Sequence, residues 1–151
     1  MPLIRKKQQE IEVKLYFYEK KTEEGDFKIV ILTDEEAKDI EKKKVADPKA
    51  VFPEVECLTT KWRKFNWELE NEIIERSQIF DEITGTSRGS WIKYRDLKFK
   101  KCLKSWDLKD EDKNPILLND MSINSLPETV VYALISKYDD KVTLKDTERK
   151  N

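Results

Sequence analysis

Acidic side chains come in short clusters along this chain, and such clusters are the first places to test for metal binding or acid–base catalysis. Asp110, Asp112 and Asn114 alternate as the ligands do in the first half of a calcium-binding loop. The stretch lacks the glycine of the sharp turn, and Met121 stands where that loop needs a glutamate. The other clusters, 34–36 and 139–140, fall at an expected helix start and at the beginning of a polar tail, where carboxylates stay solvated. We therefore predict no metal site and no pair of catalytic carboxylates.

The remaining residue types argue against most enzyme classes. The chain has no histidine, which excludes Ser–His–Asp and Cys–His nucleophile systems and every histidine-containing metal site. Gly85 and Gly89 lack the spacing and the terminal lysine of a phosphate-binding loop, so we interpret 85–89 as a turn between helices. Cys57 and Cys102 do not suggest a disulfide framework, and we expect both to be small buried hydrophobes in a reducing compartment. The sequence thus predicts a chain that is not an enzyme and that binds no cofactor.

A group of lysines offers a different kind of chemistry, the binding of phosphate groups. The predicted helix from Ser90 to Trp106 places four of them opposite its apolar stripe: Lys93, Lys100, Lys101 and Lys104. Such a basic face could hold a phosphate or a nucleic acid. The alternatives are a solvated outer face of the helix or a face that meets the acidic stretch that follows it. The 30 basic and 31 acidic residues of the chain create no global field. We favour the solvated face and do not expect nucleic acid as a partner.

The elements that would position these residues begin with a sheet. Residues 1–9 are polar without a period, which favours a flexible N-terminal arm. A two-residue alternation follows and predicts a half-buried strand, with one face formed by Ile11, Val13, Leu15 and Phe17. A turn at 24–26 leads to a returning strand at 27–32, and a third strand is expected at 54–64. The first strand and the arm could add to the sheet of a neighbouring subunit, so we name those four apolar residues as candidate partner-binding residues.

Helices account for most of the remaining chain. Thr33, Asn66 and Ser90 are expected to cap helices, and Pro127 is expected at the first position of the last helix. The second helix should include Phe80, residues 81–89 should form a loop, and the third helix should reach Trp106. We predict a single α+β domain over 10–140, in which about three antiparallel strands pack with three amphipathic helices, followed by a polar tail over 141–151.

Charged and aromatic residues within the apolar faces have structural explanations. Glu70 and Arg95 each lie inside the apolar arc of their helix, which favours an ion pair between the two helices. The four tryptophans are expected mainly in the core or at helix ends, although an exposed subset could anchor a partner.

One stretch carries a resemblance to a family. Trp106-Asp107-Leu108 is followed by the acidic run 110–112, by Pro115-Ile116, and by Ile123-Asn124 and Leu126-Pro127 before a closing amphipathic helix. This order resembles small morphogenesis proteins of tailed bacteriophages, usually described as tail assembly chaperones or small virion structural proteins. The resemblance covers roughly residues 65–140. It departs from the usual pattern at Lys113, which occupies a glycine position, and we expect Asn114 to supply the left-handed residue instead.

The resemblance implies a non-enzymatic protein that binds other phage structural proteins. A homo-oligomer is a further possible assembly of this chain. It would act in the host cytoplasm during assembly or remain in the virion as a tail, neck or capsid-surface subunit. No membrane is expected as a partner, since the longest apolar runs, such as 29–32, are far shorter than the roughly 18 residues of a membrane span.

Overall fold

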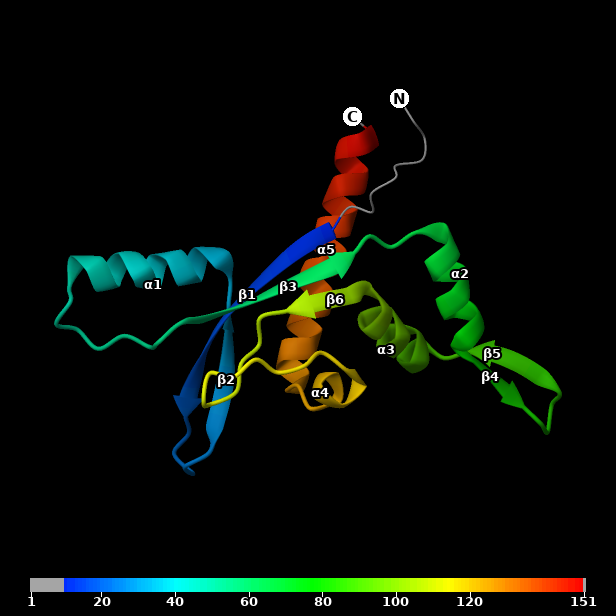
Figure 1. Cartoon of the computed structure of the whole chain (residues 1–151), viewed down its shortest axis with the longest axis horizontal. Coiled ribbons are helices and arrows are strands. Elements are labelled where there is room, and N and C mark those ends of the chain that lie inside the picture. The colour runs from blue at the N-terminus through cyan, green and yellow to red at the C-terminus, as the bar shows by residue number, and fades with distance from the viewer. Residues whose placement is uncertain (1–9, 151) are drawn as a thin grey trace.

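The computed structural model describes the backbone of residues 10–150 and the side chains of residues 10–142 (Figure 1). Its main sheet is antiparallel, with the strand order β2-β1-β3-β6. The strands are β1 (Glu10–Lys21), β2 (Phe27–Leu32), β3 (Glu56–Arg63) and β6 (Leu103–Trp106), and a separate hairpin pairs β4 (Gln78–Asp81) with β5 (Thr86–Gly89). The helices are α1 (Asp34–Ala46), α2 (Trp67–Arg76), α3 (Trp91–Cys102), α4 (Asp120–Asn124) and α5 (Glu128–Lys150). The α+β class is confirmed; the sheet is larger than expected.

Strand β1 is long because two different strands pair with its two halves. Its C-terminal half pairs with β2, from Tyr16 opposite Leu32 to Lys21 opposite Phe27. Its N-terminal half pairs with β3, from Glu10 opposite Arg63 to Phe17 opposite Glu56. Thr22 and the positive φ of Gly25 close the turn between β1 and β2. Residues 10–15 of β1 therefore have a strand neighbour on one side only.

The predicted helix starts are confirmed by their caps. The side chains of Thr33, Asn66 and Ser90 accept hydrogen bonds from the third backbone N–H of α1, α2 and α3, respectively. Asn119 and Ser122 form a reciprocal capping box at the start of α4. These side chains satisfy backbone donors that a helix start leaves without partners.

The core lies between one face of the main sheet and helices α3, α4 and α5, with Trp62 of β3 at its centre. The Trp62 ring stacks on Tyr138 of α5 at 4.7 Å and meets Phe99 of α3 edge-on at 5.1 Å. The Trp62 indole N–H donates to the Thr60 hydroxyl at 2.7 Å, and that hydroxyl donates to the Val13 carbonyl at 2.9 Å. Thr60 thus connects β1 to the central aromatic ring by polar bonds inside an apolar core.

Four elements differ from the sequence-based expectation. The prediction of a loop over 81–89 is wrong in part, because residues 78–81 and 86–89 form a hairpin. The prediction that the second helix includes Phe80 is also wrong, since Phe80 lies in β4. Helix α3 ends at Cys102, and Leu103–Trp106 forms β6 beside β3. The expected tail over 141–151 is also corrected, since α5 continues to Lys150. Lysine and glutamate favour a helix even without an apolar stripe. The loss of apolar periodicity after residue 140 therefore indicated that the helix is no longer buried, and did not indicate that it ends.

The acidic turn also differs in its detail. Lys113 itself takes the left-handed conformation, with φ 64°, and Asn114 does not. The Asp110 carboxylate accepts from the Asn114 N–H at 2.9 Å, and the Asp110 N–H donates to the Asn114 carbonyl at 2.9 Å. The turn is thus closed by Asp110 and Asn114, and its left-handed position is Lys113, the residue before Asn114.

We predict that Thr60→Val lowers the free energy of unfolding by about 2–4 kcal/mol, because it leaves the buried Trp62 N–H and Val13 carbonyl without this partner. Urea denaturation followed by tryptophan fluorescence measures the loss. Thr59→Val is the matched control, since Thr59 belongs to the same strand and faces away from the core. Equal losses in the two variants would contradict the role of the Thr60 hydroxyl.

We also predict that Lys113→Gly raises the free energy of unfolding by about 0.5–1 kcal/mol, because glycine adopts a positive φ without a Cβ clash. The same denaturation experiment measures it. Lys109→Gly, at a position without positive φ, should lower stability by about the same amount through chain entropy. A loss in both variants would show that the turn does not strain Lys113.

Candidate functional site

The apolar residues of β1 are not a contact surface. Ile11, Val13 and Leu15 are at most 2% exposed and belong to the core cluster, and Phe17 packs against it. These side chains are therefore not available to a partner, whereas addition of the strand to a neighbouring subunit's sheet through its backbone stays a prediction. They are buried because β1 lies inside the sheet and turns this face toward α5.

The four predicted lysines do not form one free basic face. Lys100 and Lys101 leave α3 toward different partners, and Lys104 lies on β6 because the helix ends before it. Three of them form ion pairs: Lys100 with Asp96 at 3.1 Å, Lys101 with Glu72 at 3.6 Å, and Lys104 with Glu10 at 2.8 Å. The Lys104 ammonium lowers the pKa of the Glu10 carboxyl, chiefly through this hydrogen bond. The three partners are acidic residues of the same chain, but none of them lies in the acidic stretch that follows the helix.

The expected ion pair between Glu70 and Arg95 is replaced by another contact. Arg95 donates to the Tyr132 hydroxyl at 3.1 Å, and its guanidinium lies 4.9 Å from the centre of the Tyr132 ring. The arginine thus joins α3 to α5 through a cation–π contact rather than through a carboxylate of α2.

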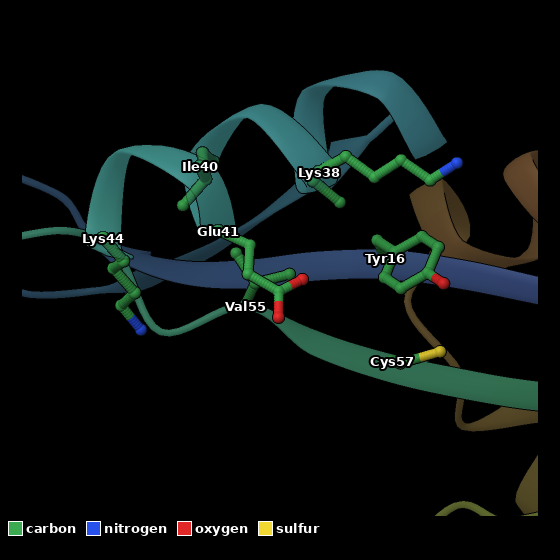
Figure 2. Close-up of a pocket in the computed structure, with 8 residues that line it drawn as sticks. Tyr16, Lys38, Ile40, Glu41, Lys44, Val55 and Cys57 are labelled. Carbon is green, nitrogen blue, oxygen red and sulfur yellow. The ribbon is translucent and has the colours of Figure 1, made fainter. Parts of the chain in front are cut away.

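A groove of about 440 Å³ separates α1 from the outer face of the sheet, and Figure 2 shows the side chains that line it. Tyr16 and Cys57 form its floor from β1 and β3, and Glu41 projects over it from α1. Cys57 is exposed, which corrects the expectation that both cysteines are buried; burial raises the pKa of the Cys102 thiol. Among the described residues, no three His, Cys, Asp or Glu side chains are placed to hold a metal ion. The groove offers contact area without a recognisable catalytic set.

A more distinctive surface lies on the segment that connects β3 to β6. We call residues 67–94, which comprise α2, the hairpin and the first turn of α3, the lobe; it extends to the side of the main sheet (Figure 1). The Ser90 N–H donates to the Ser77 carbonyl at 2.9 Å and closes the base of the hairpin. The large apolar residues that are exposed on the lobe are Trp67 (78%), Ile74 (43%), Phe80 (63%), Ile83 (96%), Trp91 (70%) and Ile92 (70%).

The geometry of their elements groups Trp67, Ile74, Phe80 and Trp91. Trp67 and Ile74 are seven positions apart on α2 and share one helix face. Ile74 and Trp91 line the same shallow hollow of about 330 Å³, together with Gln78, and Phe80 follows Gln78 on the same face of β4. Trp91 stacks on Tyr94 at 5.5 Å. We call these residues the lobe surface: Trp67, Ile74, Phe80, Trp91 and Tyr94.

Sequence reasoning did not separate Trp67 and Trp91 from the buried Trp62, although a signal was present. Each of the two follows a helix cap directly, Asn66 or Ser90, and so occupies the first helical position. The Cβ at that position points away from the body of the helix, which leaves the ring free of the core. Trp106, in contrast, is half-buried and donates to the Ile116 carbonyl at 2.8 Å.

Comparison of the chain with protein-family models, with curated proteins and with solved structures gives no match. Within the described residues, no helix is both long enough and apolar enough to cross a lipid bilayer. The site must therefore be interpreted from its own geometry.

We predict that replacing Lys93, Lys100, Lys101 and Lys104 together with alanine leaves nucleic-acid binding unchanged, because three of these charges are already paired. Fluorescence anisotropy with labelled single- and double-stranded DNA at about 50 mM salt, where phosphate contacts are strongest, provides the test. A control with Lys38, Lys42, Lys44 and Lys49 replaced removes as many charges elsewhere. Salt-sensitive binding that only the first variant loses would restore the phosphate-binding hypothesis.

Proposed function

We propose that this chain is a non-enzymatic bacteriophage assembly protein, similar to tail assembly chaperones, that binds an apolar segment of another phage structural protein. The phage context rests on the resemblance of residues 65–140 to that family. The lobe surface supports the binding role, and it is the observation that carries the proposal.

The composition of the lobe surface favours a protein partner. Trp67, Trp91 and Tyr94 are of the residue types that contribute most to protein–protein binding, because they supply large apolar area with few rotatable bonds. Two tryptophans that are each more than two thirds exposed, within one apolar surface, indicate a partner. The hollow between Ile74 and Trp91 provides a recess for one apolar side chain.

In the proposed mechanism, the lobe covers an aggregation-prone segment of a long tail protein until that protein polymerises. Trp67, Trp91 and Phe80 would lie against the segment and exclude water from its apolar side chains. The segment would leave when a tail subunit offers a larger apolar interface. This mechanism needs no bond making, which agrees with the absence of histidine from the chain.

A permanent virion subunit is the second candidate, and the one-sided pairing of residues 10–15 of β1 favours it, because an open sheet edge can join a neighbouring subunit. Mass spectrometry of purified particles separates the two. An assembly factor is absent from the particles, whereas a virion subunit is present in a fixed ratio to the tail proteins.

We predict that Trp67→Ala and Trp91→Ala each weaken binding of the tail protein by about 2 kcal/mol, or roughly 30-fold. Light scattering of an aggregation-prone phage tail protein, with and without the variants, measures the protection from aggregation. Leu117→Ala and Met121→Ala are matched controls, because both side chains are more than 75% exposed and lie outside the lobe. Full protection by both tryptophan variants, or equal loss in the controls, would contradict the assignment of the lobe surface.

A further inference from the structure

The free half of β1 presents backbone groups along an open edge. In β1, the even-numbered residues from Tyr16 onward turn their N–H and C=O groups toward β2. By the same alternation, Glu10, Glu12 and Lys14 turn theirs toward the side that β2 does not reach, and all three residues are exposed. In the part of the chain that the structure describes, the N–H groups of Glu12 and Lys14 have no backbone partner on that side.

Two lysines of α5 occupy the carbonyls of this edge. The Lys137 ammonium donates to the Lys14 carbonyl at 2.9 Å, and the Lys141 ammonium donates to the Glu12 carbonyl. Four residues of a helix rise about 6 Å, and two residues of a strand span about 6.8 Å, so the helix and strand repeats match. Lys137 is also held by Asp34 of α1 at 3.1 Å. The lysines satisfy the carbonyls of Glu12 and Lys14 and leave the N–H groups of the same two residues open.

The charged side chains along the edge pair within the single chain, Glu10 with Lys104 and Glu12 with Lys14, and they are also complementary to a second copy of the same edge. Glu10, Glu12 and Lys14 share the outer face of the sheet. Two copies of residues 10–15 can pair antiparallel about a two-fold axis near Glu12 or near Val13. The first register places Lys14 opposite Glu10 of the other copy, and the second places it opposite Glu12. Either pairing brings opposite charges together across the strands, which stabilises a sheet.

We propose that residues 10–15 of β1 form a strand-pairing site for β1 of a second copy of this chain, and that Lys137 and Lys141 gate this site. Pairing replaces the two lysine bonds by a backbone ladder and joins the two sheets into one. In the single chain, the lysines keep the edge closed to unrelated strands, as lysines at natural sheet edges do. The interaction involves only copies of this chain and leaves the lobe surface uncovered, so its failure is distinguishable from a failure of the lobe to bind another protein.

The test is the concentration dependence of self-association, measured by analytical ultracentrifugation. Glu12→Pro removes an outward N–H and adds a ring to the edge without breaking a bond between β1 and β3, so it should abolish dimers. Glu19→Pro is the matched control: it is the same substitution in the same strand, beyond the end of β3 and away from the proposed edge. Circular dichroism confirms that both variants fold.

The lysine gate predicts a change of the opposite sign. Lys137→Met and Lys141→Met together keep the apolar stems but remove the competing donors, so the dimer dissociation constant should fall by roughly tenfold or more. Lys14→Glu, which places like charges across the strands in both registers, should raise it. A double methionine variant that stays monomeric at the highest soluble concentration would overturn the proposal. A dimer that persists in the Glu12→Pro variant would also overturn the proposal. Binding of only an extended peptide of another sequence at this edge would overturn it as well.

Discussion

The contact of Trp62 with its neighbours on three elements is the constraint on which the rest of this structure depends. The ring lies between Tyr138 of α5 and Phe99 of α3, and its N–H is bound by Thr60. The Tyr138 hydroxyl in turn donates to the Arg63 carbonyl at 2.7 Å, and burial raises the pKa of Tyr138 so that it remains a donor. A chain this rich in charge has little apolar material for a core. One aromatic cluster therefore has to hold sheet and helices together.

That constraint explains why the lobe can present apolar residues without collapsing onto the core. Strands β3 and β6 are neighbours in the sheet, so the chain between them leaves the sheet at one strand and returns at the next. Both ends of the excursion are held: Trp62 anchors β3, and Phe99 and Cys102 anchor the end of α3. Lys98 adds a contact over the Phe65 ring at 4.8 Å and an ion pair with Asp139 at 3.1 Å. The apolar side chains of the core thus pack against one another, and the lobe surface is left exposed.

The sequence was sufficient to predict the elements whose signals are local. The alternation from Ile11 and the caps at Thr33, Asn66 and Ser90 depend on neighbouring residues, and the structure agrees with each. The elements that sequence reasoning missed depend on distant partners. Leu103–Trp106 continues the apolar pattern of α3, yet pairing with β3 makes it a strand. In the same way, no local feature of Ile11 shows whether its side chain faces a partner or the core. Its burial is determined by the packing of β1 against β3 and α5. The site could be predicted only as far as the possibility that some tryptophans are exposed.

Helix α5 carries both core residues and the lysines that bind the sheet edge, and both sets recur every four residues. Val130, Leu134 and Tyr138 recur every four residues and are buried, whereas Lys137 and Lys141 recur with the same spacing on the flank beside β1. The position of Tyr138 beneath Trp62 therefore also sets the position of both lysines at the carbonyls of Lys14 and Glu12. A rotation of α5 about its axis cannot release the edge without disturbing the aromatic stack. Opening of the edge must then proceed by movement of the two lysine side chains alone, whose long flexible stems allow it at little cost in packing.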